Sequence, residues 1–354
     1  MSTQVLHPRH LSREELDAFL ARGWYRIGQT LMTCRFLLFN GVLRPVVWTR
    51  LPVDDEPFSK SNRKLLRKIR RRFQVTDGPL QLDDERAALY RRYLQVARGQ
   101  RAPTLEDFLF GDSERDLFET WEITIRQNGR LVAFSWFDLG EDGVQSLLGT
   151  YDPEFGKHSL GYASMLLEVE WAREHGRNLH YAGYIVPGDS AMDYKLRVGE
   201  VEWLDQDTGR WEPWSTWSED ALPTRRLHRA LEDARQALDL QGVSARIREY
   251  RWFELPAYER SLDNALDQPL VIECFPDRHE PTVLLVTYDL ETRLYALVRC
   301  VRVAGLLQTT ADGPGQPVQV WVVSERLGHR SAPEVIAAEA ARLGDRRWSW
   351  WRRK

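Results

Sequence analysis

The sequence predicts an α+β protein, and two patterns indicate this fold class. Four apolar runs alternate with the period of a β-strand, and a helical period lies between the third and the fourth. A second series of strand-like runs is bounded by two amphipathic helices in the C-terminal third. The first four strands are expected at 118–126, 130–138, 144–151 and 179–186. The later strands are expected at about 243–253, 270–275, 283–288, 294–303 and 318–323, with helices at 224–240 and 332–343.

The N-terminal part begins with a predicted helix and a predicted hairpin. Residues 11–22 have a helical period, and Ser12 with Glu15 forms the sequence signature of a capping box. Residues 35–48 contain two apolar runs around Asn40-Gly41, a dipeptide typical of tight hairpin turns. The sequence therefore predicts a capped helix followed by a hairpin.

The segment 59–72 carries eight basic residues and no acidic one. A helical period would bury an apolar stripe and leave one face lined with cations. The stripe consists of Leu65, Leu66, Ile69 and Phe73, and the cationic face consists of Lys60, Arg63, Lys64, Arg67, Lys68 and Arg71. Because no acid balances these charges, the helix is predicted to bind nucleic-acid phosphates, with a merely solvated basic helix as the alternative.

Charge is distributed unevenly, although the formal net charge is only -3. Residues 1–72 hold 15 Lys and Arg against 6 Asp and Glu, a net of +9, so the remaining chain carries -12. This asymmetry predicts a polyanionic partner for the N-terminal part. No apolar run reaches the roughly 18 to 20 residues that cross a bilayer, and no signal-peptide pattern is present. A cytoplasmic protein without a membrane partner is expected.

The stretch 150–198 combines a loop, a helix, a strand and a polar turn. Asp152-Pro153 interrupts the preceding strand, and Lys157 to Gly161 opens the helix, on which Glu168 is expected to face outward. A loop joined to a helix N-terminus predicts an anion-binding site. The following strand ends at Pro187-Gly188, and the polar turn after it contains Met192, Tyr194 and Lys195.

Four motifs in this stretch resemble the C-terminal half of the arginyltransferase family, which moves an amino acid from a charged tRNA to a protein N-terminus. They are Tyr151-Asp152-Pro153, Ser159-Leu160-Gly161, Gly183-Tyr184-Ile185 and Met192-Asp193-Tyr194-Lys195. Gly23-Trp24 and the basic segment from Ser59 are similar to the family's N-terminal half. The family's N-terminal cysteine cluster has no counterpart, because only Cys34 stands there, so no metal, iron-sulfur cluster or other cofactor is expected.

The order of three strands, a helix and a further strand is that of a GNAT-type acyltransferase fold, which agrees with the resemblance. Residues 1–100, which include a predicted helix at 85–98, are expected to form a basic, tRNA-binding region. Residues 101–218 are expected to form the GNAT-type aminoacyl transfer domain. Residues 219–354 are expected to form an additional α+β domain whose role the sequence does not indicate.

The resemblance implies a site in which a protein α-amine attacks an activated ester. This amine has a reference pKa near 7.7 to 8.0, so it is partly neutral at pH 7 and no covalent nucleophile is required. Positioning and oxyanion stabilisation should supply most of the rate. The residues expected to hold the tRNA 3' end and the substrate are Lys157, Ser159, Leu160, Gly161, Met192 and Tyr194.

Three residues are catalytic candidates. Asp152 would take a proton from the amine or hold it as an ammonium, with a turn role as the alternative. Tyr184 would orient the terminal adenosine or the ester, unless it is a core aromatic. Lys195 would stabilise the oxyanion or bind phosphate. Asp138 is a second carboxylate candidate.

The resemblance implies an aminoacyl-tRNA protein transferase that uses arginyl-tRNA and acceptors with an acidic N-terminal residue, with leucyl-tRNA as an open alternative. A second hypothesis is an acetyl-CoA-dependent N-acyltransferase of the same fold. Against it, the loop 157–161 lacks the arginine-rich, multi-glycine sequence of a pyrophosphate-binding loop. A third hypothesis is a non-catalytic tRNA-binding protein.

Overall fold

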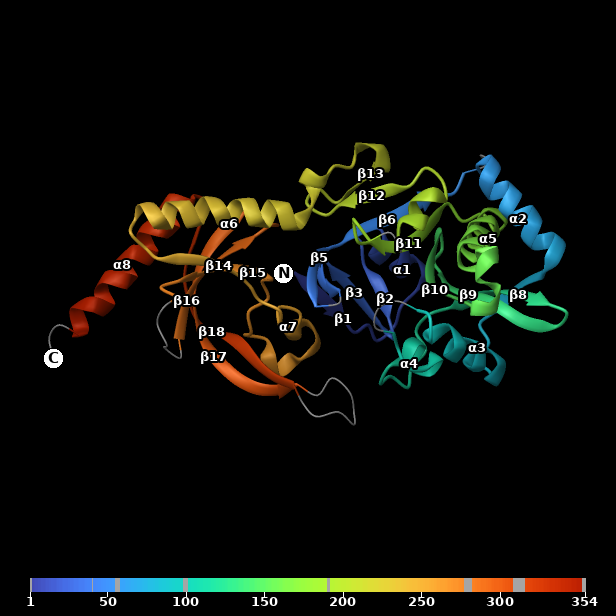
Figure 1. Cartoon of the computed structure of the whole chain (residues 1–354), viewed down its shortest axis with the longest axis horizontal. Helices are drawn as coiled ribbons and strands as arrows, with labels where there is room; N and C mark the ends of the chain where they lie inside the picture. The colour runs from blue at the N-terminus through green and yellow to red at the C-terminus, as the bar shows by residue number, and fades with distance from the viewer. Residues whose placement is uncertain are drawn as a thin grey trace. The chain divides into compact units, whose positions relative to one another are not determined.

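The structure is a computed structural model that describes residues 2–39, 41–54, 58–97, 101–189, 192–276, 282–307 and 316–351 (Figure 1). The chain forms two compact units. The larger unit contains Val5–Thr33 and Val46–Trp217. The smaller unit contains Met1–Gln4, Cys34–Pro45 and Ser218–Lys354.

An eight-stranded sheet of order β13-β12-β6-β11-β10-β9-β8-β7 forms the centre of the larger unit. Neighbouring strands are antiparallel except β10 and β11, which are parallel. The strands are β6 (Val47–Pro52), β7 (Gln74–Pro79), β8 (Thr120–Gln127), β9 (Arg130–Leu139), β10 (Gly143–Tyr151), β11 (Leu179–Ile185), β12 (Glu202–Asp205) and β13 (Arg210–Pro213). The predicted order of three antiparallel strands, a helix and a fourth strand is confirmed.

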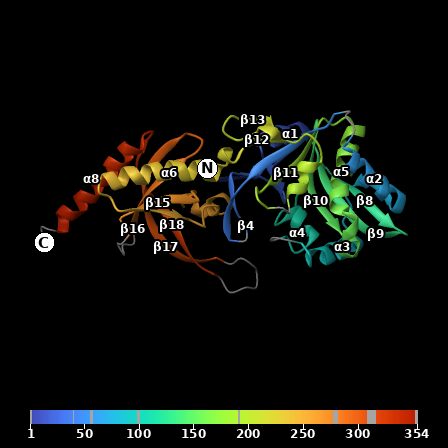
Figure 2. The same ribbon diagram turned by 45° about the horizontal axis from the view of Figure 1, so that its top comes forward.

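Helices cover both faces of this sheet. On β9, Ala133 and Phe137 pack in the core cluster of α5 (Leu160–Glu174), whereas Phe134 and Trp136 pack in the cluster of α3 (Asp84–Leu94) and α4 (Leu105–Phe110). Because successive side chains of a strand point to opposite faces, α5 lies on one face and α3 with α4 on the other. The basic helix α2 (Lys60–Arg72) packs against α5, and the two lie side by side in Figure 1 and Figure 2.

The predicted N-terminal helix is confirmed as α1 (Arg13–Leu20), with both bonds of the Ser12–Glu15 capping box. Strand β1 (Thr3–Leu6) spans the boundary between the units, and β2 (Tyr25–Ile27) pairs with β3 (Thr30–Cys34). The hairpin is confirmed as β4 (Phe36–Phe39) and β5 (Val42–Pro45) in the smaller unit, although Asn40 lies outside the described residues. Val47 and Trp48, the last residues of the predicted hairpin, instead begin β6.

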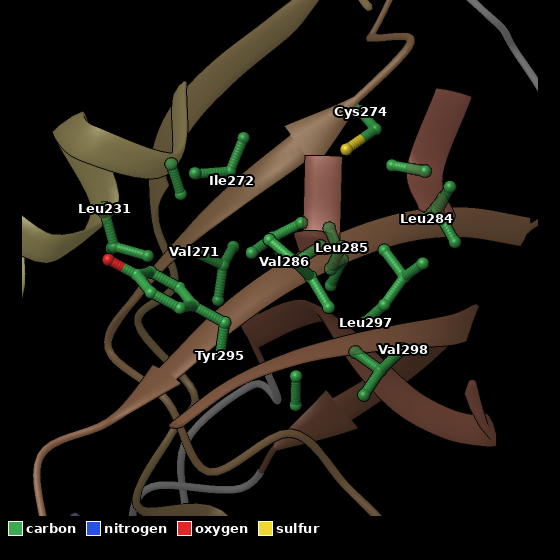
Figure 3. Close-up of a cluster of buried hydrophobic side chains, with 14 of the residues drawn as sticks. Leu231, Val271, Ile272, Cys274, Leu284, Leu285, Val286, Tyr295, Leu297 and Val298 are labelled. Carbon is green, nitrogen blue, oxygen red and sulfur yellow. The ribbon is translucent and has the colours of Figure 1, made fainter. Parts of the chain in front are cut away.

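The smaller unit contains a five-stranded antiparallel sheet of order β14-β15-β16-β17-β18. Helices α6 (Pro223–Leu240) and α8 (Pro333–Trp351) pack on it and on each other. Figure 3 shows part of the apolar core, where Leu231 of α6 lies beside Tyr295 of the sheet, and Val271 and Ile272 belong to the same buried cluster. The strands are β14 (Ala245–Glu249), β15 (Leu270–Cys274), β16 (Thr282–Asp289), β17 (Leu294–Leu307) and β18 (Gln316–Arg330), with the short helix α7 (Leu255–Tyr258).

The remaining described elements are short. Short 3-10 helices are η1 (Pro153–His158), η2 (Asp193–Arg197), η3 (Trp214–Thr216), η4 (Glu219–Ala221) and η5 (Arg260–Leu262). Within the described residues, no helix is both long and apolar enough to cross a bilayer. The α+β fold class is confirmed, and η2 is the element that carries Lys195 of the candidate site.

Candidate active site

The parallel strands β10 and β11 pair over a short length and then separate. Their register covers only Gly143–Gln145 against Leu179–Tyr181. A bulge between Ser146 and Leu148 interrupts the pairing of β10 with β9, and a second irregularity lies on β11 before Gly183. Bulges bend the strand that contains them, so both irregularities help to part the strands. We call the region beyond Gln145 and Tyr181 the strand split.

Lys195 of η2 reaches the separated part of β11. Its Nζ donates a hydrogen bond of 2.8 Å to the Tyr184 carbonyl and lies 5.8 Å from the centroid of the Tyr184 ring. Burial and the nearby Arg101 charge lower the pKa of Lys195 to about 8, although the Glu168 charge opposes this shift. The structure thus brings together two of the three predicted catalytic residues.

Helix α5 carries a buried carboxylate, Glu168, whose charge acts on Lys195. Glu168 is only 1% exposed and accepts hydrogen bonds from the Ser135 hydroxyl and, at 2.9 Å, from His180 Nε2. The prediction that Glu168 faces outward is wrong. Helix α5 is enclosed between the sheet and α2, so it is buried around more of its circumference than its apolar pattern indicates.

Two aromatic residues of the N-terminal part also border the strand split, and sequence reasoning missed both. Trp48 pairs with Tyr184 in the β6–β11 register, and its ring lies 5.5 Å from the Tyr184 ring and 6.1 Å from the Tyr25 ring. The Tyr25 hydroxyl donates to the Ser146 carbonyl. Burial, and then the Asp138 charge, raises the pKa of Tyr25, so its hydroxyl stays protonated. Gly183 leaves room for this ring, because a Cβ there would lie 3.0 Å from it.

The loop before α5 divides its predicted substrate contacts between surface and core. Lys157 and Ser159 are exposed, and Ser159 caps α5 in a left-handed conformation (φ 56°) without a side-chain cap bond. Leu160 is buried in the core, so only its main chain could meet a substrate. A Cβ on Gly161 would lie 3.3 Å from the Tyr151 ring, so this glycine permits packing within the protein.

Hydrogen bonds connect the basic helix to the segment that carries Lys195. Asn62 of α2 donates to the Arg197 carbonyl at 3.0 Å, and the Tyr162 hydroxyl lies within hydrogen-bonding distance of both Asn62 Oδ1 and this carbonyl. Tyr194 packs edge to face on Tyr162, and burial raises its pKa to about 12. Met192 starts η2, since its carbonyl accepts from the Lys195 amide.

The cationic face of α2 has the predicted composition and orientation. All six of its predicted members are exposed, whereas Leu66 and Ile69 are buried. No ion pair involves any of the six within the described part of the chain. Arg70, outside the predicted face, pairs with Glu170 of α5 at 2.7 Å. The face is therefore a concentrated positive surface beside α5.

The third catalytic candidate, Asp152, lies in a different network. Its side chain caps η1 by accepting from the Glu154 amide, and it pairs with Arg130 at 2.6 Å and Arg92 at 3.1 Å. Burial alone would raise the pKa of Asp152, but the bonds from Arg130 and Glu154 and the Arg92 charge hold it below its ordinary value. A carboxylate held in this way is a weak proton acceptor, so the geometry favours a structural role.

Asp138, the second carboxylate candidate, is fully buried and tied to the N-terminal part. Its Oδ1 accepts from Arg26 at 2.8 Å and from Thr120 at 2.6 Å. Burial raises the pKa of Asp138, although the Arg26 charge opposes the shift. Among the described His, Cys, Asp and Glu residues, no three lie close enough to hold a metal ion.

The chain is similar to known aminoacyltransferases over the part that contains this site. The family model described as arginine-tRNA-protein transferase, C terminus, matches residues 85–205. An aspartate/glutamate leucyltransferase of Leptospira interrogans is 28% identical over 200 residues, which cover 53% of this chain and 73% of that protein. One of Xanthomonas axonopodis pv. citri is 31% identical over 170 residues, which cover 46% and 67%. A GCN5-related N-acetyltransferase from Kribbella flavida is a structural neighbour, 16% identical with a TM-score of 0.26 over 50% of this chain and 55% of that one.

Proposed function

Since the chain belongs to the arginine-tRNA-protein transferase family, and so is an aminoacyl-tRNA-dependent aminoacyltransferase, we propose that it moves leucine from leucyl-tRNA to an acceptor's N-terminal α-amine. The observation that carries the proposal is that an exposed cationic helix and the half-buried Lys195–Tyr184 pair belong to one unit. The first suits tRNA, and the second suits acyl transfer.

The cationic face of α2 is proposed to bind the tRNA backbone. Each phosphate that Lys or Arg neutralises releases counterions, which makes binding strong and sensitive to salt. Asn62 and Tyr162 connect α2 to η2, and an acceptor stem on this face is proposed to extend its 3' end toward Lys195. The proposed 3'-end contacts are Lys157, Ser159, Tyr194 and the main-chain amides of Leu160 and Gly161, with Met192 supporting the turn.

The transfer step needs stabilisation of one developing charge and movement of one proton. The acceptor amine attacks the ester carbonyl, a C–N bond forms, and the C–O bond to the tRNA 3' oxygen breaks. The proton that the amine loses balances the proton that the 3' oxygen gains. Lys195 is proposed to stabilise the oxyanion as an ammonium, and its pKa of about 8 also allows it to exchange a proton near neutral pH. Tyr184 is proposed to orient the ester.

The charges around Lys195 favour leucine over arginine as the transferred residue. Lys195 and Arg101 would repel a guanidinium group, and the nearby carboxylate of Glu168 is engaged by His180 and Ser135. The names of the bacterial relatives agree with a leucyl donor. The same two cations would attract the carboxylate of an acceptor that begins with Asp or Glu, so such acceptors are proposed as the partners.

A transfer assay with several donors tests this function. The purified chain is incubated with labelled leucyl-tRNA, arginyl-tRNA or acetyl-CoA and with peptides that begin with Asp, Glu or Ala. We expect label from leucyl-tRNA in the Asp and Glu peptides. Label from arginyl-tRNA alone would mean that arginine, and not leucine, is the transferred residue. Label from acetyl-CoA alone would overturn the proposal. Binding of tRNA without transfer would favour a non-catalytic role.

A further inference from the structure

Two buried side chains at the start of the strand split have polar atoms without partners. Gln145 and Asp138 face each other in the β9–β10 register, and both are 0% exposed. Within the described residues, neither polar atom of the Gln145 amide makes a well-aligned hydrogen bond, although this amide lies close enough to the Tyr25 hydroxyl to oppose the rise of the Tyr25 pKa, and Asp138 Oδ2 has no partner. Buried polar groups in native proteins are nearly always hydrogen-bonded, because an unpaired group loses its interaction with water and gains nothing. Asp138 Oδ2 and the Gln145 amide therefore have hydrogen-bonding capacity that the protein itself does not fill.

The charge of this cluster is already balanced and its geometry is fixed. Arg26 holds Asp138 Oδ1 through Nη1, while its Nε donates to the Gly28 carbonyl at 2.7 Å and its Nη2 to the Leu109 carbonyl at 3.0 Å. All three nitrogens of the guanidinium are engaged, so Arg26 cannot turn to fill the unpaired Oδ2. The Asp138–Arg26 pair is neutral overall and leaves one directed acceptor oxygen free.

The cluster lies at the start of the strand split, next to half-buried residues. Gln145 is the last residue of β10 that pairs with β11, and Ser146 and Leu147 after it are half-buried. The half-buried Tyr25 donates its hydroxyl proton to the Ser146 carbonyl, beside the Gln145 amide. The Tyr25 hydroxyl therefore shows that a hydrogen-bond donor fits beside the acceptor oxygens at the strand split.

The arrangement of acceptors suits an ammonium group. Asp138 Oδ2, Gln145 Oε1 and the Ser146 carbonyl offer three acceptors, and a primary ammonium offers three N–H donors. The remaining Gln145 Nε2 could donate to the first carbonyl of a peptide. Resting on the function proposed above, we propose that Asp138, Gln145 and the Ser146 carbonyl bind the N-terminal α-ammonium of the acceptor protein, replacing Tyr25 as the donor to Ser146.

The position of the cluster agrees with two substrates that approach from opposite faces of the sheet. Asp138 lies on the face of Trp136, α3 and α4, because it alternates with Phe137, which packs on the α5 side. Helices α5 and α2 lie on the other face. A peptide N-terminus and a tRNA 3' end could therefore meet at the split without competing for one surface.

Peptide titrations without tRNA test this site. Peptides with N-terminal Asp are prepared with a free amine or with an N-acetyl group, and their affinities are measured by isothermal titration calorimetry. The wild type should bind the free-amine peptide at least about 10-fold more tightly, and Gln145→Leu should reduce this preference below about 3-fold. Thr150→Val is the matched control, since it removes another buried, unpartnered hydroxyl of β10 and should keep the preference.

A second variant covers the outcome in which Gln145→Leu does not fold. Tyr25→Phe removes only the competing hydroxyl, so it should strengthen binding of the free-amine peptide and leave the acetylated peptide unchanged. The site is wrong if the wild type binds neither peptide or both equally. It is also wrong if a folded Gln145→Leu keeps the preference, or if Tyr25→Phe weakens it, as expected where a buried water fills the cluster.

The titrations separate this site from the function on which it rests. Binding that depends on the free amine, together with a failure of leucyl transfer, would keep the ammonium site and reject the donor. Leucyl transfer with an unchanged peptide KM in Gln145→Leu would keep the function and reject the site.

Discussion

Lys195 and Tyr184 are joined by a hydrogen bond of 2.8 Å from the lysine Nζ to the tyrosine main-chain carbonyl. This bond fixes η2 to β11 at the point where β11 has left β10, so a cation is held where a strand partner would otherwise lie. The pH dependence of transfer should report on this cation.

The rate of leucyl transfer should depend on the protonation of Lys195. Its ammonium is present below a pKa of about 8 and lost above it, while the acceptor amine becomes more reactive as pH rises, so kcat should pass through a maximum. Lys195→Arg keeps its charge at high pH and should lose the alkaline decline. Lys195→Met should lower kcat by roughly 10² to 10³. Initial rates from pH 6 to 9.5, corrected for spontaneous deacylation, measure this. An alkaline decline that persists unchanged in Lys195→Arg would exclude the role.

The cationic face of α2 should control tRNA affinity and its salt dependence. Replacing Arg63, Lys64, Arg67 and Lys68 by Ala should weaken binding and reduce the slope of log K against log salt, by about 0.7 to 0.9 for each phosphate that the variant no longer neutralises. Filter binding between 50 and 300 mM salt measures this. A matched control removes four exposed arginines of the smaller unit, Arg225, Arg229, Arg246 and Arg293. Equal effects in both fourfold variants would mean that net charge alone, and not this face, governs binding.

The buried carboxylate of Glu168 should matter for stability. Glu168→Ala leaves the donors of Ser135 and His180 buried without a partner, so it should cost about 3 kcal/mol of unfolding free energy. Glu170→Ala, on the same helix, removes the partner of the half-exposed Arg70 and should cost less than about 1 kcal/mol. Urea denaturation compares the two variants. Similar midpoints would contradict the role of Glu168 as a structural anchor.

Ala substitutions at two glycines that follow β10 in the chain distinguish the effect of backbone strain from the effect of a steric contact. Both Gly183 and Gly188 have a positive φ, of 80° and 84°, so Ala at either position should cost about 1 to 2 kcal/mol. At Gly183 the added Cβ would also meet the Tyr25 ring at 3.0 Å, whereas nothing lies within 4 Å at Gly188. Gly183→Ala should therefore displace the Tyr25 hydroxyl from the Ser146 carbonyl and, like Tyr25→Phe, lower the KM for the acceptor peptide, and Gly188→Ala should not. Equal KM values in the two variants would mean that Tyr25 does not affect binding of the acceptor peptide.

Local patterns predicted most helices and strands because caps and periodicity are local properties. The capping box of α1, the apolar stripe of α2 and the strands around Asn128-Gly129 all follow from residues within a few positions. Strand β7 escaped prediction because it contains Gly78-Pro79 and gains its conformation by pairing with β8. Helix α4 was missed because its six residues are too few for a period to be visible.

The candidate site was predictable only where its residues belong to one continuous stretch. The motifs around Tyr184 and Lys195 are close in sequence, and the structure joins these two residues. Tyr25 and Trp48 reach the split through pairing with β3 and β11, which no local pattern specifies. Gln145 is one polar residue within a strand, and its meaning depends on Asp138 lying opposite.

Mass spectrometry of the acceptor after reaction is the most direct test of the central claim. A peptide that begins with Asp is incubated with the chain and leucyl-tRNA, and its fragment ions are sequenced. The account predicts one added leucine in amide linkage to the N-terminal α-amine, formed only when that amine is free and absent with Lys195→Met. A peptide recovered without leucine, or with leucine on a side chain, would contradict it.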